Sequence, residues 1–227
     1  DAIYALLLTG KDQLNQSEKI TVELGKQTLP VSTTANPLGY LKYTYTASEI
    51  QPDMLNADIT QTTDSPSWGG LYLQYFEKFD QVQQQKGILS VTKKLFIEKI
   101  GSDGKQELLP LGKEKLKTGD KVITRLTLSL KQDMDFLYLK DFRAACFEPI
   151  GQLSGNQWKF GTVYYEESKD AVTNFFFNSL AKGTYVLEYP VWVNQAGTYQ
   201  DGIATFQSMY APEYTAYSEA GKITVTK

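Results

Sequence analysis

Apolar and polar residues alternate with a period of two through most of this chain, and no other feature constrains the fold as strongly. The alternation is cleanest in KVITRLTLSLK, where Val122, Leu126, Leu128 and Leu130 share one face. Successive side chains of a β-strand point to opposite faces of a sheet, so the pattern predicts strands with one buried face. It recurs in EKITVEL, LGYLKYTYTA, DFLYLKD, TNFFFNSL, TYVLEYPVWVN, IATFQSMYAPEY and KITVTK. The segment ADITQTTDSPSWGGLYLQYFEKF predicts two more strands, separated by Asp64-Ser65-Pro66. We therefore expect an all-β chain.

The spacing of these segments is typical of antiparallel β-sandwiches. Asp103 and Gly104 lie between two strand-like segments and predict a hairpin turn. Pro190 removes one ladder donor, so its strand should have an edge or a bulge at that point. Trp192, in the same alternating segment, is expected in the core. No segment after Gly10 has the pattern of a long helix, and no fixed-period repeat indicates a propeller or solenoid.

A polar, Gln-rich segment, DQVQQQKG, separates the strand-like segments into two groups. It predicts two β modules, at residues 15–82 and 86–227, joined by a short linker. The chain has no initiator Met and no basic-then-apolar leader, so we expect a mature chain or an excised fragment.

The first residues differ from the rest of the chain. Ile3, Leu6 and Leu7 recur at helical spacing, and Gly10 stands where a left-handed C-terminal cap would lie. Residues 1–14 are therefore expected to be the last turns of an apolar helix.

The absence of histidine excludes most familiar catalytic sites in this chain. Ser-His-Asp and Cys-His catalysis need an imidazole, and zinc sites usually need one as a ligand. The remaining candidates are two carboxylate pairs, Glu166 with Glu167 and Asp133 with Asp135, but neighbours of this kind are far more often solvated strand ends. We expect no enzyme, no cofactor and no metal, although Asp133 and Asp135 could offer oxygens to calcium.

Charge and hydropathy narrow the range of partners. A net charge of −3 gives no basic field for a phosphate backbone, so nucleic acid is not an expected partner. No apolar run approaches the roughly 20 residues that span a bilayer, so direct membrane insertion is not expected. Cys146 is the single cysteine, which excludes a disulfide within the chain.

Several tracts together resemble the C-terminal end of the bacterial alpha-2-macroglobulin family. The most specific is AGTYQDGIATFQSMYAPEYTAYSEAG, followed by WGGLYLQYFEKF; the others are LKTGDKVITRLTL, DMDFLYLKDFRAACFEP and FFFNSLAKGTYVLEYPVWVN. The resemblance implies that residues 1–14 are the last helix of a thioester-type helical domain. Residues 15–82 would be a CUB-like portion, and residues 86–227 a terminal macroglobulin-type sandwich similar to the receptor-binding domain of the animal proteins.

The function implied by the resemblance is that of a non-catalytic part of a protease trap. In this family a bait region is cleaved and the modules rearrange, and some members capture the protease through a Cys-Gln thioester. Cys146 does not fit that thioester motif, because CFEP has Pro149 where Gln is required. The present chain would pack on the thioester-type domain, shield it and transmit movement. Its partners would be the upstream domains of the same polypeptide and the trapped proteases.

A shield needs stiff aromatic side chains on an exposed edge. The candidates are Tyr164 and Tyr165 in VYYEESKDAV, and Tyr210, Pro212 and Tyr214 in MYAPEY.

The apolar helix face of Ile3, Leu6 and Leu7 would be exposed without its own domain. We therefore expect an incompletely covered apolar surface on residues 1–82.

A trap must meet exogenous proteases, so the expected location is the periplasm or outer surface of a Gram-negative bacterium, with an upstream lipid anchor. The alternative function is that of an extracellular carbohydrate- or surface-binding β-sandwich module. It would need two or three aromatic rings on one exposed face, near polar hydrogen-bonding groups and a concave site.

Overall fold

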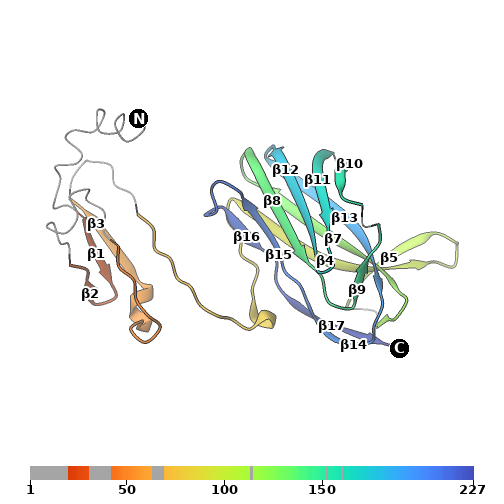
Figure 1. The fold of residues 1–227 in the computed structure, drawn as a ribbon, viewed down its shortest axis with the longest axis horizontal. Helices are drawn as coiled ribbons and strands as arrows, with labels where there is room; N and C mark the ends of the chain where they lie inside the picture. Colours follow the sequence, from red (N-terminus) through yellow and green to blue (C-terminus); the bar gives the residue numbers. More distant parts are fainter. Residues whose placement is uncertain (1–19, 31–41, 63–68, 113–114, 152, 160) are drawn as a thin grey trace. The chain divides into compact units, whose positions relative to one another are not determined.

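The computed structural model describes residues 20–30, 42–62, 69–112, 115–151, 153–159 and 161–227. The chain divides into two compact units, Asp1–Leu73 and Gln74–Lys227. The described residues are almost entirely β, and their only helices are two short 3-10 turns, η1 (Pro52–Leu55) and η2 (Phe79–Gln81) (Figure 1). The all-β prediction is confirmed. The predicted helix end with Ile3, Leu6 and Leu7 lies outside the described residues.

The first unit contains a small antiparallel sheet of order β2-β1-β3, formed by Gln27–Thr28, Ile20–Leu24 and Ala57–Gln61. Its tight turn depends on Gly25, which has a φ of 61°. A Cβ on this residue would lie 2.7 Å from the backbone carbon of Asp53. Leu24 and Leu29 are the buried hydrophobic residues in the described part of this unit.

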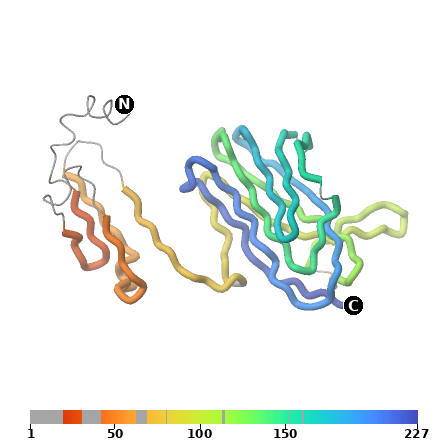
Figure 2. The backbone as a smooth tube through the Cα atoms, viewed as in Figure 1, coloured from red at the N-terminus to blue at the C-terminus, as the bar shows by residue number. Residues whose placement is uncertain are grey.

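Two strands predicted from alternation do not pair in the described structure. Residues 42–46 and 69–78 belong to no ladder, and the second segment runs as an extended chain (Figure 2). Its aromatic side chains are open to solvent, with Tyr72 93% and Phe76 103% exposed. The expected uncovered helix face of Ile3, Leu6 and Leu7 lies outside the described residues, so the incompletely covered apolar surface on residues 1–82 stays a prediction.

The second unit is built on a six-stranded antiparallel sheet and a five-stranded antiparallel sheet. The first has the order β10-β11-β12-β8-β15-β16, formed by Gly155–Lys159, Thr162–Ser168, Val172–Leu180, Met134–Phe142, Ala204–Ser208 and Thr215–Tyr217. The second has the order β5-β4-β7-β13-β9, formed by Gln106–Pro110, Leu89–Ile100, Lys121–Leu130, Gly183–Val193 and Phe147–Pro149. The hairpin predicted at Asp103 and Gly104 joins β4 to β5.

Pro190 has a visible effect on the pairing of β13. One side of the strand pairs with β7 from Gly183 to Trp192. The other side pairs with β9 only from Val191 to Val193, directly after the proline. Among the described residues, this side of the strand therefore has no ladder partner before Pro190, whose carbonyl accepts the Ile150 N–H at 3.3 Å, and the edge predicted from the missing N–H is present. Trp192 is 46% exposed, so the prediction that it lies in the core is wrong; its neighbours Val191 and Val193 point inward instead.

A third, three-stranded sheet has the order β14-β17-β6, formed by Gly197–Asp201, Gly221–Thr226 and Leu116–Lys117.

The Gln-rich segment expected to be a free linker also belongs to this unit. Gln85 forms an antiparallel bridge with Tyr217, and the Ala220 N–H donates to the carbonyl of Val82 at 3.2 Å. The segment is therefore held against the sandwich by backbone hydrogen bonds.

The core lies between the two large sheets. Phe175 and Phe177 on β12 and Phe206 on β15 meet leucines of the five-stranded sheet such as Leu126 and Leu187, and all five are at most 2% exposed. Their positions follow from the period of two, which sends alternate side chains of each strand into the interior.

Candidate functional site

The turn between β15 and β16 presents the most exposed of the tyrosines predicted to make a shielding contact. Tyr210 is 78% exposed and its neighbour Met209 is 51% exposed. Pro212, next in the same turn, is exposed, whereas Tyr214 is partly buried against the core. The turn therefore carries two large apolar side chains that the rest of the described chain leaves open to solvent.

Hydrogen bonds within the turn fix its backbone. The Ser208 N–H donates to the carbonyl of Tyr214 at 3.1 Å, and the Tyr214 N–H donates to the carbonyl of Ala211 at 3.0 Å. The Ala211 N–H donates to Oγ of Ser208 at 3.2 Å. Thr215 donates its hydroxyl to the carbonyl of Pro212 at 2.6 Å. A turn tied in this way presents its side chains with little conformational entropy left to lose.

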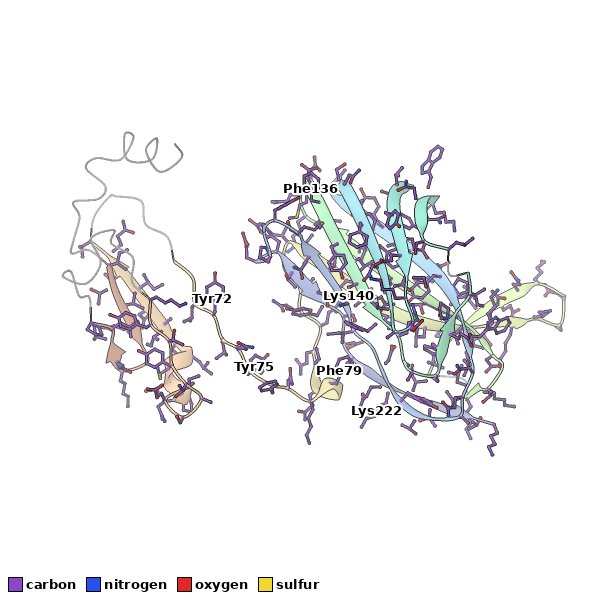
Figure 3. The ribbon with its side chains drawn as sticks, in the orientation of Figure 1. Tyr72, Tyr75, Phe79, Phe136, Lys140 and Lys222 are labelled. Carbon is purple, nitrogen blue, oxygen red and sulfur yellow. The ribbon has the colours of Figure 1, made fainter. Side chains whose placement is uncertain are left out.

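Phe136, near the start of β8, lies against this turn and was not singled out from the sequence. Its ring meets the ring of Tyr210 edge-on, with centroids 5.2 Å apart and planes at 90°. Its carbonyl accepts the N–H of Met209 at 2.9 Å. Figure 3 shows Phe136 at the end of its strand, and its side chain is 48% exposed. We call Phe136, Met209 and Tyr210 the aromatic tip.

The backbone of Phe136 is strained. Its φ is 53°, and no other non-glycine residue in the described ranges has a positive φ. The left-handed region costs an L-residue about 1–2 kcal/mol. Strain of this kind persists where the surrounding structure enforces it, and it is concentrated at functional sites. The sequence contains no signal for it, because DMDFLYLKD reads as an ordinary strand.

The second pair of predicted contact residues, Tyr164 and Tyr165, is divided by the alternation of β11. Tyr164 is 3% exposed and packs against the rings of Phe175 and Phe177, which departs from the expected exposed edge. Burial raises its pKa to about 12. Tyr165 points outward, is 43% exposed, and lies beside the ring of Phe176. Of this pair, only Tyr165 has a surface that a partner could reach.

The candidate carboxylate pairs do not converge on one site. Glu166 and Glu167 follow each other on β11 and so point to opposite faces of the sheet. Burial raises the pKa of Glu166, whereas hydrogen bonds from Asn174 and Lys169 lower the pKa of Glu167.

Asp133 and Asp135 also do not form one site. Asp133 accepts the backbone N–H of Lys182 at 2.7 Å and thereby joins two turns, while Asp135 is exposed. Within the described ranges, no three His, Cys, Asp or Glu residues are grouped so that they could hold a metal ion.

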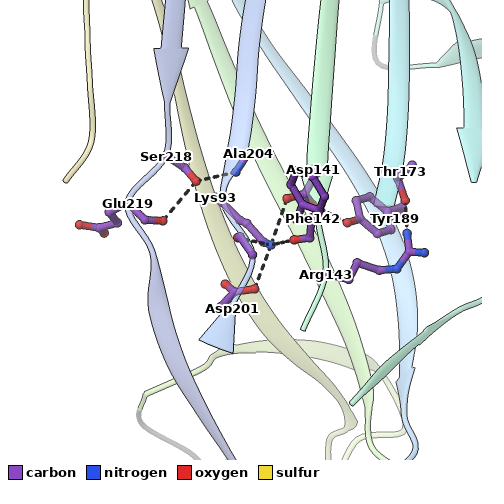
Figure 4. Close-up of polar contacts among 11 residues, drawn as sticks. Lys93, Asp141, Phe142, Arg143, Thr173, Tyr189, Asp201, Ala204, Ser218 and Glu219 are labelled. Atoms are coloured by element: carbon purple, nitrogen blue, oxygen red, sulfur yellow. Dashed lines mark hydrogen bonds and ion pairs between the residues drawn. The ribbon is translucent and has the colours of Figure 1, made fainter. Parts of the chain in front are cut away.

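A buried ionic cluster lies deeper in the same unit (Figure 4). Lys93 on β4 places its Nζ 3.0 Å from Oδ1 of Asp141 on β8 and 2.9 Å from Oδ1 of Asp201 at the end of β14. The ammonium also donates to the carbonyls of Phe142 at 2.7 Å and Gly202 at 2.9 Å. The side chains of Lys93 and Asp141 are only 3% and 0% exposed. We call Lys93, Asp141 and Asp201 the lysine clamp, which connects all three sheets of the unit.

Neighbouring polar and charged groups stabilise the charges of the clamp. Burial alone would lower the pKa of Lys93, but the two carboxylates outweigh it and the pKa is raised. Tyr189 donates its hydroxyl to Asp141. Nearby, Arg143 donates to the hydroxyl of Thr173 and to the carbonyl of Asp170, in the turn between β11 and β12. The clamp itself is enclosed, and each of its three charged groups lies within 3.0 Å of an opposite charge, so it joins the sheets.

Cys146 is a buried residue of the core. Burial raises the pKa of its thiol to about 11, which leaves little thiolate at neutral pH. We predict that Cys146 will not react with Ellman's reagent at pH 8 in the folded chain and will react fully once the chain is unfolded in denaturant. Stoichiometric reaction of the folded chain on the time scale of the unfolded control would contradict this.

Comparison with known proteins places this geometry in a family. The model of the bacterial alpha-2-macroglobulin MG10 domain matches residues 89–213, which begin at the first residue of β4 and include the whole aromatic tip. The match covers more than half of the chain. The chain belongs to the bacterial alpha-2-macroglobulin family. This match confirms the family resemblance inferred from the sequence. Macroglobulin domains are non-catalytic parts of protease inhibitors.

Three solved structures of bacterial alpha-2-macroglobulins match this chain. A Salmonella alpha-2-macroglobulin point mutant matches with a TM-score of 0.50 at 17% identity, over 94% of this chain and 14% of that protein. The Salmonella protein reacted with methylamine matches with a TM-score of 0.49 at 16% identity, over 94% and 14%. Trypsin-activated alpha-2-macroglobulin from Escherichia coli matches with a TM-score of 0.49 at 14% identity, over 98% and 15%. Among curated proteins, none is significantly similar to the chain.

The chain therefore spans about one seventh of the length of these alpha-2-macroglobulins. The likeness to the Salmonella mutant supports the fold of the macroglobulin sandwich.

Proposed function

We propose that this chain is the non-catalytic C-terminal part of a bacterial protease-trapping inhibitor, whose macroglobulin sandwich packs on a thioester-type helical domain and shields it. The residues before the sandwich would be a CUB-like portion that transmits the conformational change. The observation that carries the proposal is the aromatic tip: three large, solvent-exposed side chains on a hydrogen-bonded turn and the adjacent strand of a domain of the alpha-2-macroglobulin family.

The chemistry of the tip suits a shield. A thioester hydrolyses when water reaches it, so a cover must exclude water from a small area. Tyrosine supplies a large, stiff ring with two side-chain torsions, and aromatic residues of this kind are enriched where interfaces are most tightly packed. Tyr210, with Met209 beside it, offers such a surface at the end of a hydrogen-bonded turn. Pro212 and Tyr214 fix the base of the same turn, and Tyr165 would be a secondary contact.

Tyr210→Ala tests this proposal in the full-length parent protein. We predict that the variant will react with methylamine about tenfold faster than the wild type, which corresponds to the loss of about 1.4 kcal/mol of contact energy. The reaction is followed by the free thiol released and by the mass of the methylamine adduct. Trp158→Ala is the matched control, because Trp158 is an exposed aromatic residue on β10, away from the turn.

Two results would count against the shield. A wild-type parent that yields neither a thiol nor an adduct has no thioester to protect. Equal rates for Tyr210→Ala, Trp158→Ala and the wild type would show that the tip does not cover the thioester.

The partners and the location follow from the same proposal. The chain would contact upstream domains of its own polypeptide, and the full-length protein would hold proteases; the Escherichia coli relatives are described as activated by trypsin and by elastase. An extracellular or envelope location is consistent with the family, and a lipid anchor would lie outside this chain. Among the described residues, no helix is long and apolar enough to span a bilayer.

The carbohydrate-binding alternative has less support in the described structure. Tyr138 and Phe176 lie side by side on the outer face of the six-stranded sheet, near Asn174. Their rings stack with centroids 5.1 Å apart and planes at 24°, so each covers a face that a sugar would need.

A further inference from the structure

The aromatic tip joins two segments that are far apart in the sequence. Phe136 comes from β8, whereas Met209 and Tyr210 come from the turn after β15. The ladder between β8 and β15 pairs Leu137 with Ser208, which brings the two segments together directly before the turn. The support for Tyr210 is therefore built by a strand that is itself fixed in the centre of the sheet.

Phe136 contacts the turn in two ways at once. Its carbonyl accepts the N–H of Met209 at 2.9 Å, and its ring meets the ring of Tyr210 edge-on. Phe136 makes both contacts with a left-handed backbone, at a point where the regular ladder with β12 is interrupted. That ladder has pairs at Asp135 and Leu137 and none at Phe136 between them.

We propose that Phe136 is a positioning residue for Tyr210: its left-handed backbone and edge-on ring hold the tyrosine in the orientation that makes the shielding contact. The inference rests on the proposed shielding function and assigns Phe136 a role within it. A residue that served only the stability of the strand would adopt an extended conformation, which satisfies the ladder without strain. The strain is retained where its effect is to aim and support an exposed ring.

The test is a double-mutant cycle in the full-length parent, with Phe136→Ala, Tyr210→Ala and the double variant. Edge-on aromatic pairs contribute a factor of about three to ten in an equilibrium, so we expect Phe136→Ala to speed the methylamine reaction by about that factor. In the double variant the rate should equal that of Tyr210→Ala alone, because Phe136 acts through Tyr210. Phe136→Tyr keeps the ring and should restore the wild-type rate.

A second measurement does not depend on the thioester. Amide hydrogen exchange of the peptide that contains Met209 should be faster in Phe136→Ala by about fivefold or more, because the turn loses its ordered support. Phe136→Gly adopts the same φ without strain and tests the ring separately from the backbone. Phe142→Ala is the matched control, since Phe142 is a half-exposed phenylalanine at the other end of β8.

The outcomes separate the two proposals. If Tyr210→Ala speeds the reaction while Phe136→Ala changes neither the rate nor the exchange, the positioning role is wrong and the shield stands. Additive effects in the double variant would also overturn the positioning role. If exchange at Met209 responds to Phe136→Ala but neither variant changes the methylamine rate, Phe136 orders the turn, but the shield and the positioning role that rests on it both fail.

Discussion

Replacing Lys93 with methionine is expected to lower the free energy of unfolding of the sandwich unit by about 3–5 kcal/mol. Methionine keeps the volume of the side chain but removes the charge, so Asp141 and Asp201 are left facing each other in the interior. The side chain of Asp141 is 0% exposed and that of Asp201 is 15% exposed. The carbonyls of Phe142 and Gly202 also lose the donor that they now share. Denaturant unfolding, followed by tryptophan fluorescence at pH 7, measures the loss.

The pH dependence of this variant has a defined sign. In the wild type, burial raises the pKa of Asp201 above its ordinary value of 3.8, and Asp141 raises it further while Lys93 opposes the shift. Without Lys93 the upward shift grows. A carboxyl whose folded pKa is raised favours folding when protonated, and that stability is lost as the pH rises from the unfolded value through the folded one. The deficit of Lys93→Met should therefore be smaller at pH 4 than at pH 7.

Lys94→Met is the matched control, because the neighbouring lysine is exposed. We expect this variant to stay within about 0.5 kcal/mol of the wild type, as surface substitutions usually do. If Lys93→Met were equally mild, or if its deficit did not shrink at low pH, the clamp would not be the ionic connection described above.

Gly202→Ala is the second substitution with a large expected effect. The chain passes so close to β8 at this point that a Cβ on Gly202 would lie 2.2 Å from the carbonyl oxygen of Phe142 and 2.3 Å from its carbonyl carbon. Both atoms are backbone, so the strands must move apart. We expect a loss of about 3 kcal/mol, at the upper end of the range for overpacked cores.

The effect should also couple to the clamp. Lys93 donates to the carbonyls of both Phe142 and Gly202, so separating these segments pulls apart two of its acceptors. The combined Lys93→Met and Gly202→Ala variant should lose less stability than the sum of the two single losses. Calorimetric or denaturant unfolding of the four proteins measures this difference.

Gly221→Ala provides the control for the glycine substitution. Nothing lies within 4 Å of a Cβ placed on Gly221, which begins β17. An alanine there should be neutral or slightly stabilising, because it restricts the unfolded chain. Equal stability of Gly202→Ala and Gly221→Ala would show that the close approach at Phe142 relaxes without cost.

The sequence was sufficient to predict the strands, but not how some of them pair. The period of two predicted β7, β8, β12 and β13, and Pro190 predicted the edge in β13 because a missing N–H acts locally. The same alternation predicted strands at residues 42–46 and 69–78, which pair with no described strand. Alternation reports that one face of a segment suits burial, whereas a ladder also needs a partner that the local sequence does not specify.

The candidate site was likewise predictable from the sequence only in part. The turn with Tyr210 and Pro212 was recognisable from the sequence because its residues are contiguous and the tract resembles one family. Phe136 was not recognisable, because its role depends on a φ of 53° and on a contact with a turn more than 70 residues away. Tyr164 was expected at an exposed edge and lies in the core, since two adjacent tyrosines are chemically alike until a sheet covers one of them.

The sequence by itself determined that this chain is all-β, that it lacks the imidazole chemistry of most hydrolases, and that it belongs with the bacterial alpha-2-macroglobulins. Only the tertiary structure decided which of two neighbouring lysines is buried. Lys93 and Lys94 stand side by side in the same strand, yet one is enclosed by Asp141, Asp201 and two carbonyls while the other faces solvent. The acceptors lie as far as 109 positions along the chain, so the burial of Lys93 depends on the packing of three sheets. Periodicity is a local property of a strand, whereas the electrostatic partners of a buried charge are fixed by contacts between distant strands.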